Sequence, residues 1–320
     1  MGRRLALGLR AKGFEVEVID TRKARKFLAI RLHKSDKNDA RGLAELALLG
    51  IGEIREVHVK SLECQRLRSE LVLRHQVVKQ RASLQAAIRS LLADNDINLK
   101  LPRGAKMRSV IEEALTPTNE LIGAHVREQA LPLLDLWDGM RRYVEASDRR
   151  LKSIALADPV MVRLMGVPGV GFICAISFYT AIDNPDRFNR ASDAGPYLGM
   201  IPAVAQSGSA IRRARITKAG SKLTRSHMVA AARVLVYKIR DDSALADWSR
   251  ALTARIGYSK AKVAVARKIA VLLLALWKSG EEFTAYPKRA PRLPRETAGL
   301  DTGHISGAST QNQEAVPSLL

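Results

Sequence analysis

Few residues in this chain could crosslink it, hold a structural metal or anchor it in a membrane. Its two cysteines, Cys64 and Cys174, lie far apart in the sequence and match no CxxC or cysteine–histidine spacing suited to zinc. They are predicted to be reduced thiols that pack as small apolar groups. The longest apolar run, residues 269–277 (IAVLLLALW), follows Arg267 and Lys268 and is too short to cross a bilayer, so it predicts a buried helix. No signal peptide is recognisable, and a cytoplasmic protein is expected.

Acidic residues are scarce relative to basic ones. The 320 residues include 53 Lys and Arg against 32 Asp and Glu, which gives a formal net charge of +21 and a pI near 10.4. The apolar fraction of 47% is that of a globular chain with room for two or three domains. A polyanion is the natural partner, because each neutralised phosphate releases condensed counterions. An anionic membrane is the rival partner, and since no membrane segment is found, nucleic acid is favoured.

The first sixty residues mix helical and strand patterns. Residues 3–12 (RRLALGLRAK) have the apolar spacing of a helix. Residues 14–20 (FEVEVID) alternate apolar and polar side chains and predict a strand, and helical patterns follow over 22–32 and 34–47. This order indicates part of an α/β domain, whose single strand must pair with something else to form a sheet.

Two long helices are predicted next, over residues 59–93 and 128–157. In the second, apolar side chains recur at alternating spacings of three and four, a heptad-like seam interrupted by Ser147. The two helices can form an antiparallel pair within the chain or a contact between two copies, and the pattern does not choose. A third region begins at Asp158, and the Pro-, Arg- and Gly-rich residues 288–320 predict a disordered tail.

Two carboxylates stand three residues apart in the stretch KSDKNDARGLAELA (34–47). On a helix, Asp36 and Asp39 project from one face, with Cβ atoms roughly 5–6 Å apart. Close carboxylates repel unless a cation neutralises them, and Mg²⁺ is commonly held by one or two carboxylates together with substrate phosphate oxygens. The plain alternative is that Asp near a helix N-terminus is favoured by capping and the helix dipole alone. The spacing leaves both interpretations open.

A second candidate site lies in the stretch AQSGSAIRRARITKAGSKLTR (205–225). It contains no acidic residue and six basic ones: Arg212, Arg213, Arg215, Lys218, Lys222 and Arg225. Ser207 and Ser209 flank Gly208 in a predicted turn just before them. A serine hydroxyl on a turn, beside guanidinium groups that bind phosphate oxygens, could attack a phosphodiester. The alternative is a plain Ser-Gly-Ser turn beside arginines that only hold a nucleic-acid backbone.

The stretch GVPGVG (166–171) precedes an apolar helical segment and resembles the hairpin of a helix-hairpin-helix module. Backbone N–H groups near Gly169 and Gly171 would then meet a DNA phosphate. A glycine-rich turn inside a helical core explains the pattern nearly as well. No G-x-x-x-x-G-K-[ST] motif follows, so ATP binding is unsupported. Three isolated histidines are interpreted as surface or core residues rather than ligands or bases: His33, His75 and His227.

The order of these segments carries a family resemblance. Over residues 3–285 the chain contains EVEVIDTRKARKFLAIRLHKSDKNDARGLAELA, two long helices, LMGVPGVGFICAISFYTAI, YLGMIPAVAQSG, RITKAGSKLTRSHMVAAA and KVAVARKIAVLLLALW. It resembles the DEDD transposases of insertion sequences, relatives of the Piv-type invertases and the bridge-RNA recombinases. The resemblance implies that Asp36 and Asp39 are the last two of four Mg²⁺-binding acids. It also implies that Ser207, with Ser209 as the fallback, forms a covalent link to DNA.

The resemblance further implies an α/β plus mainly α architecture in four parts. These are a truncated RNase-H/RuvC-like domain (1–58), a helical coiled-coil linker (59–157), a helical serine transposase domain with a helix-hairpin-helix-like element (158–287) and the tail (288–320). The expected partners are DNA in a bacterial, nucleoid-associated setting and further copies of the chain. Some relatives also use a structured guide RNA that selects donor and target, which leaves an RNA partner open.

One part of the family pattern has no counterpart in this sequence. The first Asp and the Glu normally precede the segment that matches residues 2–20, so an incomplete Mg²⁺ site is expected. Either the start codon is assigned too late or the element is a truncated relic. Site-specific DNA recombination for insertion-sequence movement is the leading interpretation. The alternatives are a non-catalytic DNA- or RNA-binding remnant and a resolvase that cuts branched DNA by metal-only hydrolysis.

Overall fold

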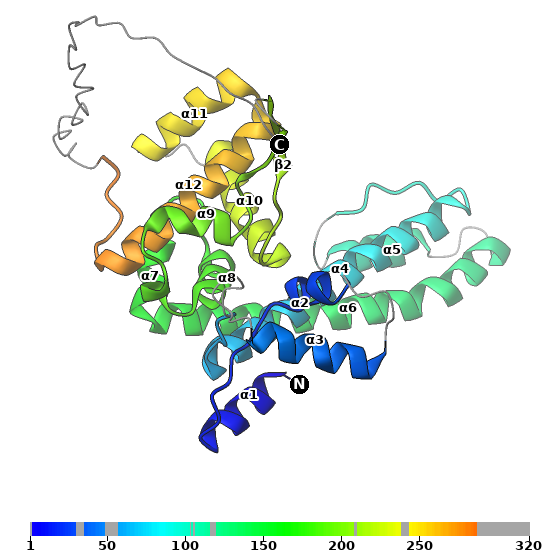
Figure 1. The fold of residues 1–320 in the computed structure, drawn as a ribbon. Coiled ribbons are helices and arrows are strands. Elements are labelled where there is room, and N and C mark those ends of the chain that lie inside the picture. Colours follow the sequence, from blue (N-terminus) through cyan, green and yellow to red (C-terminus); the bar gives the residue numbers. More distant parts are fainter. Residues whose placement is uncertain are drawn as a thin grey trace, which may run out of the picture. The chain divides into compact units, whose positions relative to one another are not determined.

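The computed structural model of the chain describes residues 2–29, 35–48, 57–102, 104, 106–115, 120–207, 210–237 and 243–286. Over these residues the fold is mainly helical, with one sheet of two antiparallel strands (Figure 1). The contacts between residues divide the chain into a unit that ends at Ala285 and a second that starts at Tyr286. The predicted tail, 288–320, lies outside the described residues.

The N-terminal segment consists of short helices. They are α1 (Gly2–Ala11), α2 (Thr21–Leu28) and α3 (Asp36–Leu48). The strand predicted at residues 14–20 is wrong, because these residues have no strand assignment. A strand is held by a ladder of bonds to a partner; here Arg10 donates to the Val16 carbonyl and the Val57 N–H donates to the Val18 carbonyl, each across 2.6 Å. The expected α/β part thus has no sheet among the described N-terminal residues, whereas the mainly helical part is confirmed.

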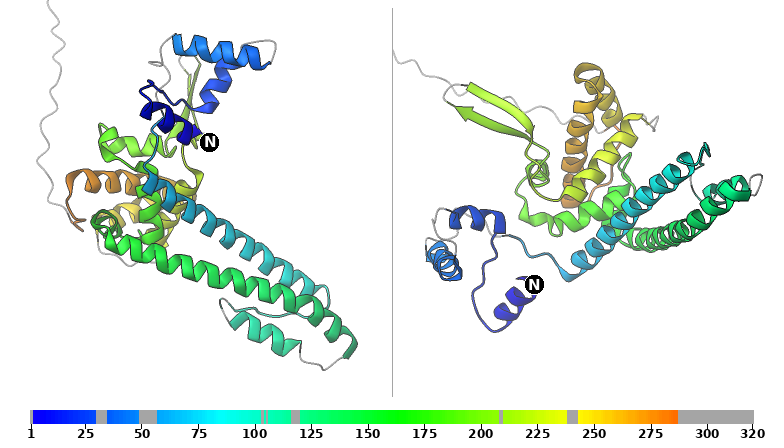
Figure 2. Two further views of the ribbon diagram at one scale, coloured as in Figure 1. Left: turned by 90° about the horizontal axis from the view of Figure 1, so that it is seen from below. Right: turned by 90° about the vertical axis from the view of Figure 1, so that its right-hand side faces the viewer.

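The two long helices form an antiparallel pair within the chain (Figure 2). They are α4 (Leu62–Ala93) and α6 (Glu120–Ala157). Ser147, which interrupts the apolar seam, is fully buried and donates its hydroxyl to Glu70 of α4 across 3.4 Å. Glu70 also pairs with Arg150 at 2.9 Å, and Arg74 pairs with Asp148. These polar contacts fix the register of an intramolecular pair, one of the two arrangements that the sequence left open.

A short helix, α5 (Lys106–Ala114), covers the distal end of this pair. Ile88 of α4, Ile111 of α5 and Leu134 of α6 are fully buried in one apolar cluster. Beside the cluster, Arg108 bonds to three carboxylates: Asp135, Glu112 and Asp138. These hydrogen bonds raise the pKa of Arg108 above its ordinary value and tie α5 to α6.

The C-terminal part consists of helices around a common apolar core. They are α7 (Pro159–Met165), α8 (Phe172–Ile182), α9 (Ala194–Tyr197), α10 (Lys222–Tyr237), α11 (Ala244–Ile256) and α12 (Tyr258–Ser279), with 3-10 turns at Pro185–Arg187 and Ala191–Asp193. Phe178 of α8 packs with Ile269 and Leu273 of α12, all fully buried. The buried helix predicted at 269–277 is therefore confirmed. Among the described residues, no helix is long and apolar enough to span a membrane.

A carboxylate just after α8 ties the start of α4 to this core. Asp183 adopts a positive φ of 67° and accepts hydrogen bonds from the Ser61 N–H (2.9 Å), the Ser61 hydroxyl (2.6 Å) and His58 Nε2 (2.5 Å). Lys60 Nζ donates to carbonyls in the last turn of α8, among them that of Thr180 across 2.6 Å. The segment leading into α4 is thus bonded to the end of α8. We call this set of contacts the Asp183 clamp.

The clamp places an ionised carboxylate in a nearly buried position. Burial alone would raise the pKa of Asp183, whose side chain is 7% exposed, but hydrogen bonds from Cys64, Ser61 and His58 outweigh it and hold this pKa well below its ordinary value. Burial also raises the pKa of the Cys64 thiol to about 12 and lowers the pKa of Lys60 to about 8. Both cysteines are free and buried, which confirms the prediction of packed thiols.

Two of the histidines interpreted as isolated contact one another. The rings of His75 in α4 and His227 in α10 meet edge to face, with centroids 6.2 Å apart. Burial, and then the neighbouring His75 and Arg74, lower the pKa of His227 to about 4. His227 is therefore a neutral side chain in a helix contact, while His33 lies outside the described residues.

Replacing Asp183 by Asn is expected to lower the free energy of unfolding by about 3 kcal/mol, because the neutral amide no longer matches the donors that surround it. Urea unfolding followed by circular dichroism measures the change. The matched control is Asp186→Asn, which alters an exposed carboxylate three residues further on and is expected to stay within about 0.5 kcal/mol of the parent. Equal stability of the two variants would contradict the clamp.

The depressed pKa of His227 predicts a loss of stability in mild acid. The contribution of the neutral ring is complete above about pH 6.5, the unfolded pKa, and is lost as the pH falls toward 4. Between pH 7 and 4.5 the parent should lose about 2 kcal/mol more than His227→Gln does. His125→Gln, at an exposed histidine, is the control and should follow the parent. A pH profile of His227→Gln that matches the parent's would overturn this assignment.

Candidate functional site

The acid pair lies in the first turn of α3, as the sequence predicted. Ser35 precedes the helix, and its hydroxyl oxygen accepts the Asn38 N–H across 3.2 Å, which is the geometry of a capped N-terminus. Asp36 is exposed and Asp39 is half-buried. Because the helix dipole favours negative charge at this end, two carboxylates three residues apart suit this turn with or without a metal ion.

The donor set of this turn fits part of a magnesium site. The carboxylates of Asp36 and Asp39 offer the hard oxygen ligands that Mg²⁺ accepts, and this ion commonly takes its remaining ligands from water and substrate phosphate. Within the described ranges, no group of three or more His, Cys, Asp or Glu side chains is placed to hold a metal. The pair could therefore hold an ion only together with ligands from elsewhere.

Ser207 is the last residue of a β-strand that sequence reasoning missed. The hairpin consists of β1 (Pro202–Ser207) and β2 (Ala210–Ile216), and Ser207 pairs with Ala210 across its end. Ala205 lies opposite Arg212 in this register. The hairpin thus brings the backbone of the predicted nucleophile next to that of the basic stretch. Ser209 lies outside the described residues, as do the side chains of residues 204–214.

The base of the hairpin is fixed by two backbones that nearly touch. Gly199 and Gly220 have φ angles of +67° and +72°, and a Cβ on Gly220 would lie 2.2 Å from the Tyr197 carbonyl oxygen. A Cβ on Gly199 would likewise meet the Ala219 backbone at 2.3 Å. The Lys218 N–H donates to the Gly199 carbonyl across 3.1 Å. Only glycine fits at these two positions, where the backbones of residues 197–199 and 218–220 cross. We call this the glycine crossing; it sets where the hairpin leaves the core.

Arg225 holds the same crossing from α10. Its Nη1 donates to the carbonyls of Leu198 (3.1 Å), Ala219 (2.5 Å) and Gly220 (3.3 Å), and burial lowers its pKa below the ordinary value. This residue was predicted to bind phosphate. In the structure its guanidinium binds backbone carbonyls instead, and the phosphate contact stays a prediction. Three other members of the predicted basic set are exposed at the hairpin base: Arg215, Lys218 and Lys222.

The two glycines of the GVPGVG turn have different surroundings. Gly169 has a φ of +85°, and a Cβ there would lie 2.6 Å from the Ala231 carbonyl oxygen of α10, so this glycine is needed for helix packing. Gly171 caps α8, is exposed and has open space around its Cα. Gly171 is thus exposed and Gly169 half-buried, and for both the phosphate contact stays a prediction.

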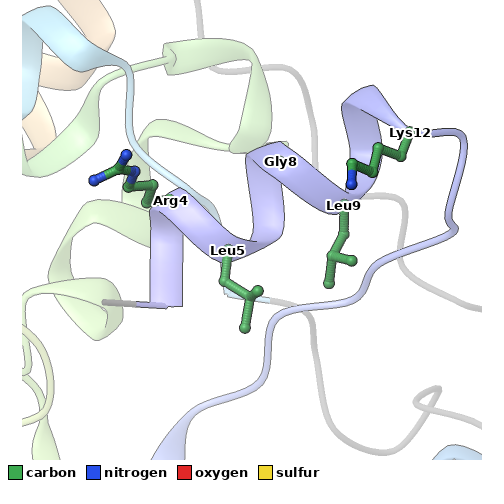
Figure 3. Close-up of a pocket in the computed structure, with 5 residues that line it drawn as sticks. All are labelled: Arg4, Leu5, Gly8, Leu9 and Lys12. Atoms are coloured by element: carbon green, nitrogen blue, oxygen red, sulfur yellow. The ribbon is translucent and has the colours of Figure 1, made fainter.

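A surface hollow on α1 lies apart from these candidate residues in the sequence. It is lined by Arg4, Leu5, Gly8, Leu9 and Lys12, with Leu5 and Leu9 pointing to the same side of the helix (Figure 3). No carboxylate, thiol or hydroxyl is among these residues. The hollow therefore offers no hydroxyl or thiol nucleophile and no carboxylate for a metal ion.

Comparison with known proteins places these segments in one family. A family model described as "Transposase IS116/IS110/IS902 family" matches residues 161–247, and one for the DEDD transposases of IS110, described as "Transposase", matches residues 1–95. The chain is 30% identical over 263 residues to the transposase for insertion sequence element IS1111A of Coxiella burnetii, which covers 79% of this chain and 69% of that protein. The chain belongs to the IS110/IS116/IS902 family of transposases.

More distant relatives point the same way. A probable family 20 transposase of Pseudomonas aeruginosa is 25% identical, over 76% of this chain and 72% of that protein. The transposase for IS1328 of Yersinia enterocolitica is 23% identical, over 85% and 79%. The function of this insertion-sequence transposase is DNA transposition, which implies DNA binding, and its DEDD domain implies a divalent metal.

The glycine crossing gives a test of what positions the hairpin. Gly220→Ala is expected to cost at least about 3 kcal/mol of unfolding free energy, because the new Cβ meets backbone at a positive φ. Gly139→Ala in α6, where a Cβ would meet nothing within 4 Å, is the control and should be neutral or stabilising by up to about 1 kcal/mol. Thermal unfolding measures the stability of both variants. A Gly220→Ala protein as stable as the parent would contradict the claim that the backbones leave no room for a side chain at this position.

Proposed function

We propose that this transposase cuts and rejoins DNA through a serine nucleophile on the hairpin, assisted by a metal ion on α3. The supporting observation is that the two family matches fall on the two predicted sites. The match over residues 1–95 contains Asp36 and Asp39, and the match over residues 161–247 contains Ser207 and the basic stretch.

Ser207 would act by transesterification. Its Oγ forms a bond to phosphorus while the bond from phosphorus to one sugar oxygen breaks; the hydroxyl gives up its proton and the released sugar oxygen takes one up. The protein–DNA phosphodiester preserves the energy of the broken bond. Rejoining by another sugar hydroxyl then needs no ATP, in agreement with a sequence that has no nucleotide-binding G-x-x-x-x-G-K-[ST] motif.

The charged residues would hold the DNA for this step. Asp36 and Asp39 would bind Mg²⁺ through carboxylate oxygens, and the bound ion would offset charge on the attacked phosphodiester. The basic side chains would hold backbone phosphates, bidentately where they are arginines. These are Arg212, Arg213, Arg215, Lys218, Lys222 and Arg225, together with the backbone at Gly169 and Gly171.

In this proposal each of the three parts expected from the sequence has its own role. Residues 1–58 would carry the metal part, 59–157 the helical linker and 158–287 the serine part. Assembly of further copies, and selection of sites by a structured RNA, belong to the proposal as well. Assembly would bring the metal part and the serine part of different copies to one DNA site, and the RNA would supply the sequence specificity.

Ser207→Ala is expected to abolish covalent protein–DNA adducts, a loss of at least about a thousandfold, because no other step replaces the nucleophile. The assay incubates the protein with supercoiled DNA that carries the element ends and Mg²⁺, and detects adducts by their shift in denaturing gels. Ser209→Ala is the matched control and should retain them.

Three outcomes would contradict the proposal. Adducts formed by Ser207→Ala would show that another residue attacks. Nicking without any adduct would indicate metal-only hydrolysis. Binding with a steep salt dependence but no nicking by the parent would indicate a non-catalytic nucleic-acid-binding protein.

A further inference from the structure

Two tyrosines meet at the end of α10 that is remote from the hairpin. Tyr237, the last residue of α10, is 64% exposed. Its ring contacts that of Tyr258, the first residue of α12, with centroids 4.5 Å apart and planes at 68°. Lys222 begins α10 beside the hairpin, so Tyr237 lies ~22 Å further along the helix axis. The pair is therefore separate from the site proposed above.

Basic side chains flank both rings. Lys262, one turn into α12, places its Nζ 5.0 Å from the centroid of the Tyr258 ring. Arg233, one turn before Tyr237 on α10, is exposed. The two helices contain eight basic residues and no acidic one: Lys222, Arg225, Arg233, Lys260, Lys262, Arg267, Lys268 and Lys278. Of these, Lys262 and Arg233 lie one turn from the rings, and their charge favours an anionic ligand.

The pair stands on a rigid base. Helices α10 and α12 lie side by side (Figure 1) and share one core, in which Ala232 and Leu235 of α10 pack with Ala261 and Val265 of α12, all nearly or fully buried. The ring of Tyr237 is therefore exposed at a fixed position. Such a ring loses little conformational entropy when a flat group stacks on it.

We propose that Tyr237 and Tyr258 form a stacking platform for an unpaired base of single-stranded nucleic acid, with Lys262 and Arg233 beside its phosphates. Aromatic side chains among basic residues are the usual means of binding single strands, because every base has a face that can stack. A double helix would satisfy the cations but would hide its base faces between neighbouring pairs. The platform therefore distinguishes unpaired from paired strands, which the basic stretch of the hairpin would not do.

The test compares binding of labelled dT12, U12 and a 12-base-pair duplex by fluorescence anisotropy, with the full chain at fixed salt. Tyr237→Leu/Tyr258→Leu is expected to weaken binding of at least one single strand by about tenfold or more, while duplex affinity changes less than about twofold. The two single-stranded arms show whether the platform takes DNA, RNA or both. Tyr237→Phe/Tyr258→Phe should keep the parent affinities, because stacking needs the ring and not the hydroxyl.

Matched controls separate the platform from folding and from the proposed nucleophile. Tyr143→Leu, at an exposed tyrosine of α6, should bind like the parent, and so should Ser207→Ala. Tyr237→Ser alone changes one exposed side chain and should still lose about threefold or more on a single strand if the double variant fails to fold. Photo-crosslinking of a 5-bromouracil strand should modify the peptide 234–238, which contains Tyr237.

Single-strand affinity within twofold of the parent in a folded double variant would overturn the inference. An equal loss on the duplex, or no measurable single-strand binding by the parent, would do the same. Unchanged strand binding together with lost self-association in size-exclusion chromatography would assign the rings to a protein contact instead.

Discussion

The ionised carboxylate of Asp183 ties the start of the long helical pair to the C-terminal core. It bonds to the segment that leads into α4, and α8 in front of it packs on two sides. Ile176 of α8 lies in a cluster with Leu67 of α4 and Leu151 of α6, while Phe178 lies in the core with α10 and α12. Because a nearly buried charge is costly without its donors, the clamp and the packing of α8 stabilise one another. One short helix thus joins the long helical pair to the core that carries the hairpin.

The hairpin combines a rigid base with exposed charge. The crossing of Gly199 and Gly220 leaves no room for a side chain, and Arg225 bonds the surrounding carbonyls. The lysines of the same stretch, Lys218 and Lys222, face solvent. The serine nucleophile that we propose for this hairpin would have to be held in place against a polyanion. A base fixed by packing would hold it there, while the exposed charges would meet phosphate.

Periodicity predicted the parts of the fold that local sequence determines. The long helices α4 and α6 and the common turn of Asp36 and Asp39 follow from apolar spacing and capping. The alternation of apolar and polar side chains at residues 14–20 gave a wrong strand prediction, because a strand also needs a partner strand and the segment itself does not reveal one. The hairpin was missed because its second strand, rich in arginine, has no clear apolar alternation. Contacts such as Ser61 to Asp183, which span 122 residues, leave no local pattern at all. For the same reason spacing could not tell Gly169, which meets α10, from Gly171, which does not.

The central claim is that a hairpin serine becomes bonded to DNA, and the most direct measurement locates that bond. Adducts formed with element DNA and Mg²⁺ are digested with nuclease and trypsin, and the peptide that retains a nucleotide is sequenced by mass spectrometry. The account predicts a nucleotide on Ser207 within the peptide 191–212. A nucleotide on any other residue, or DNA cut without a modified peptide, would contradict it.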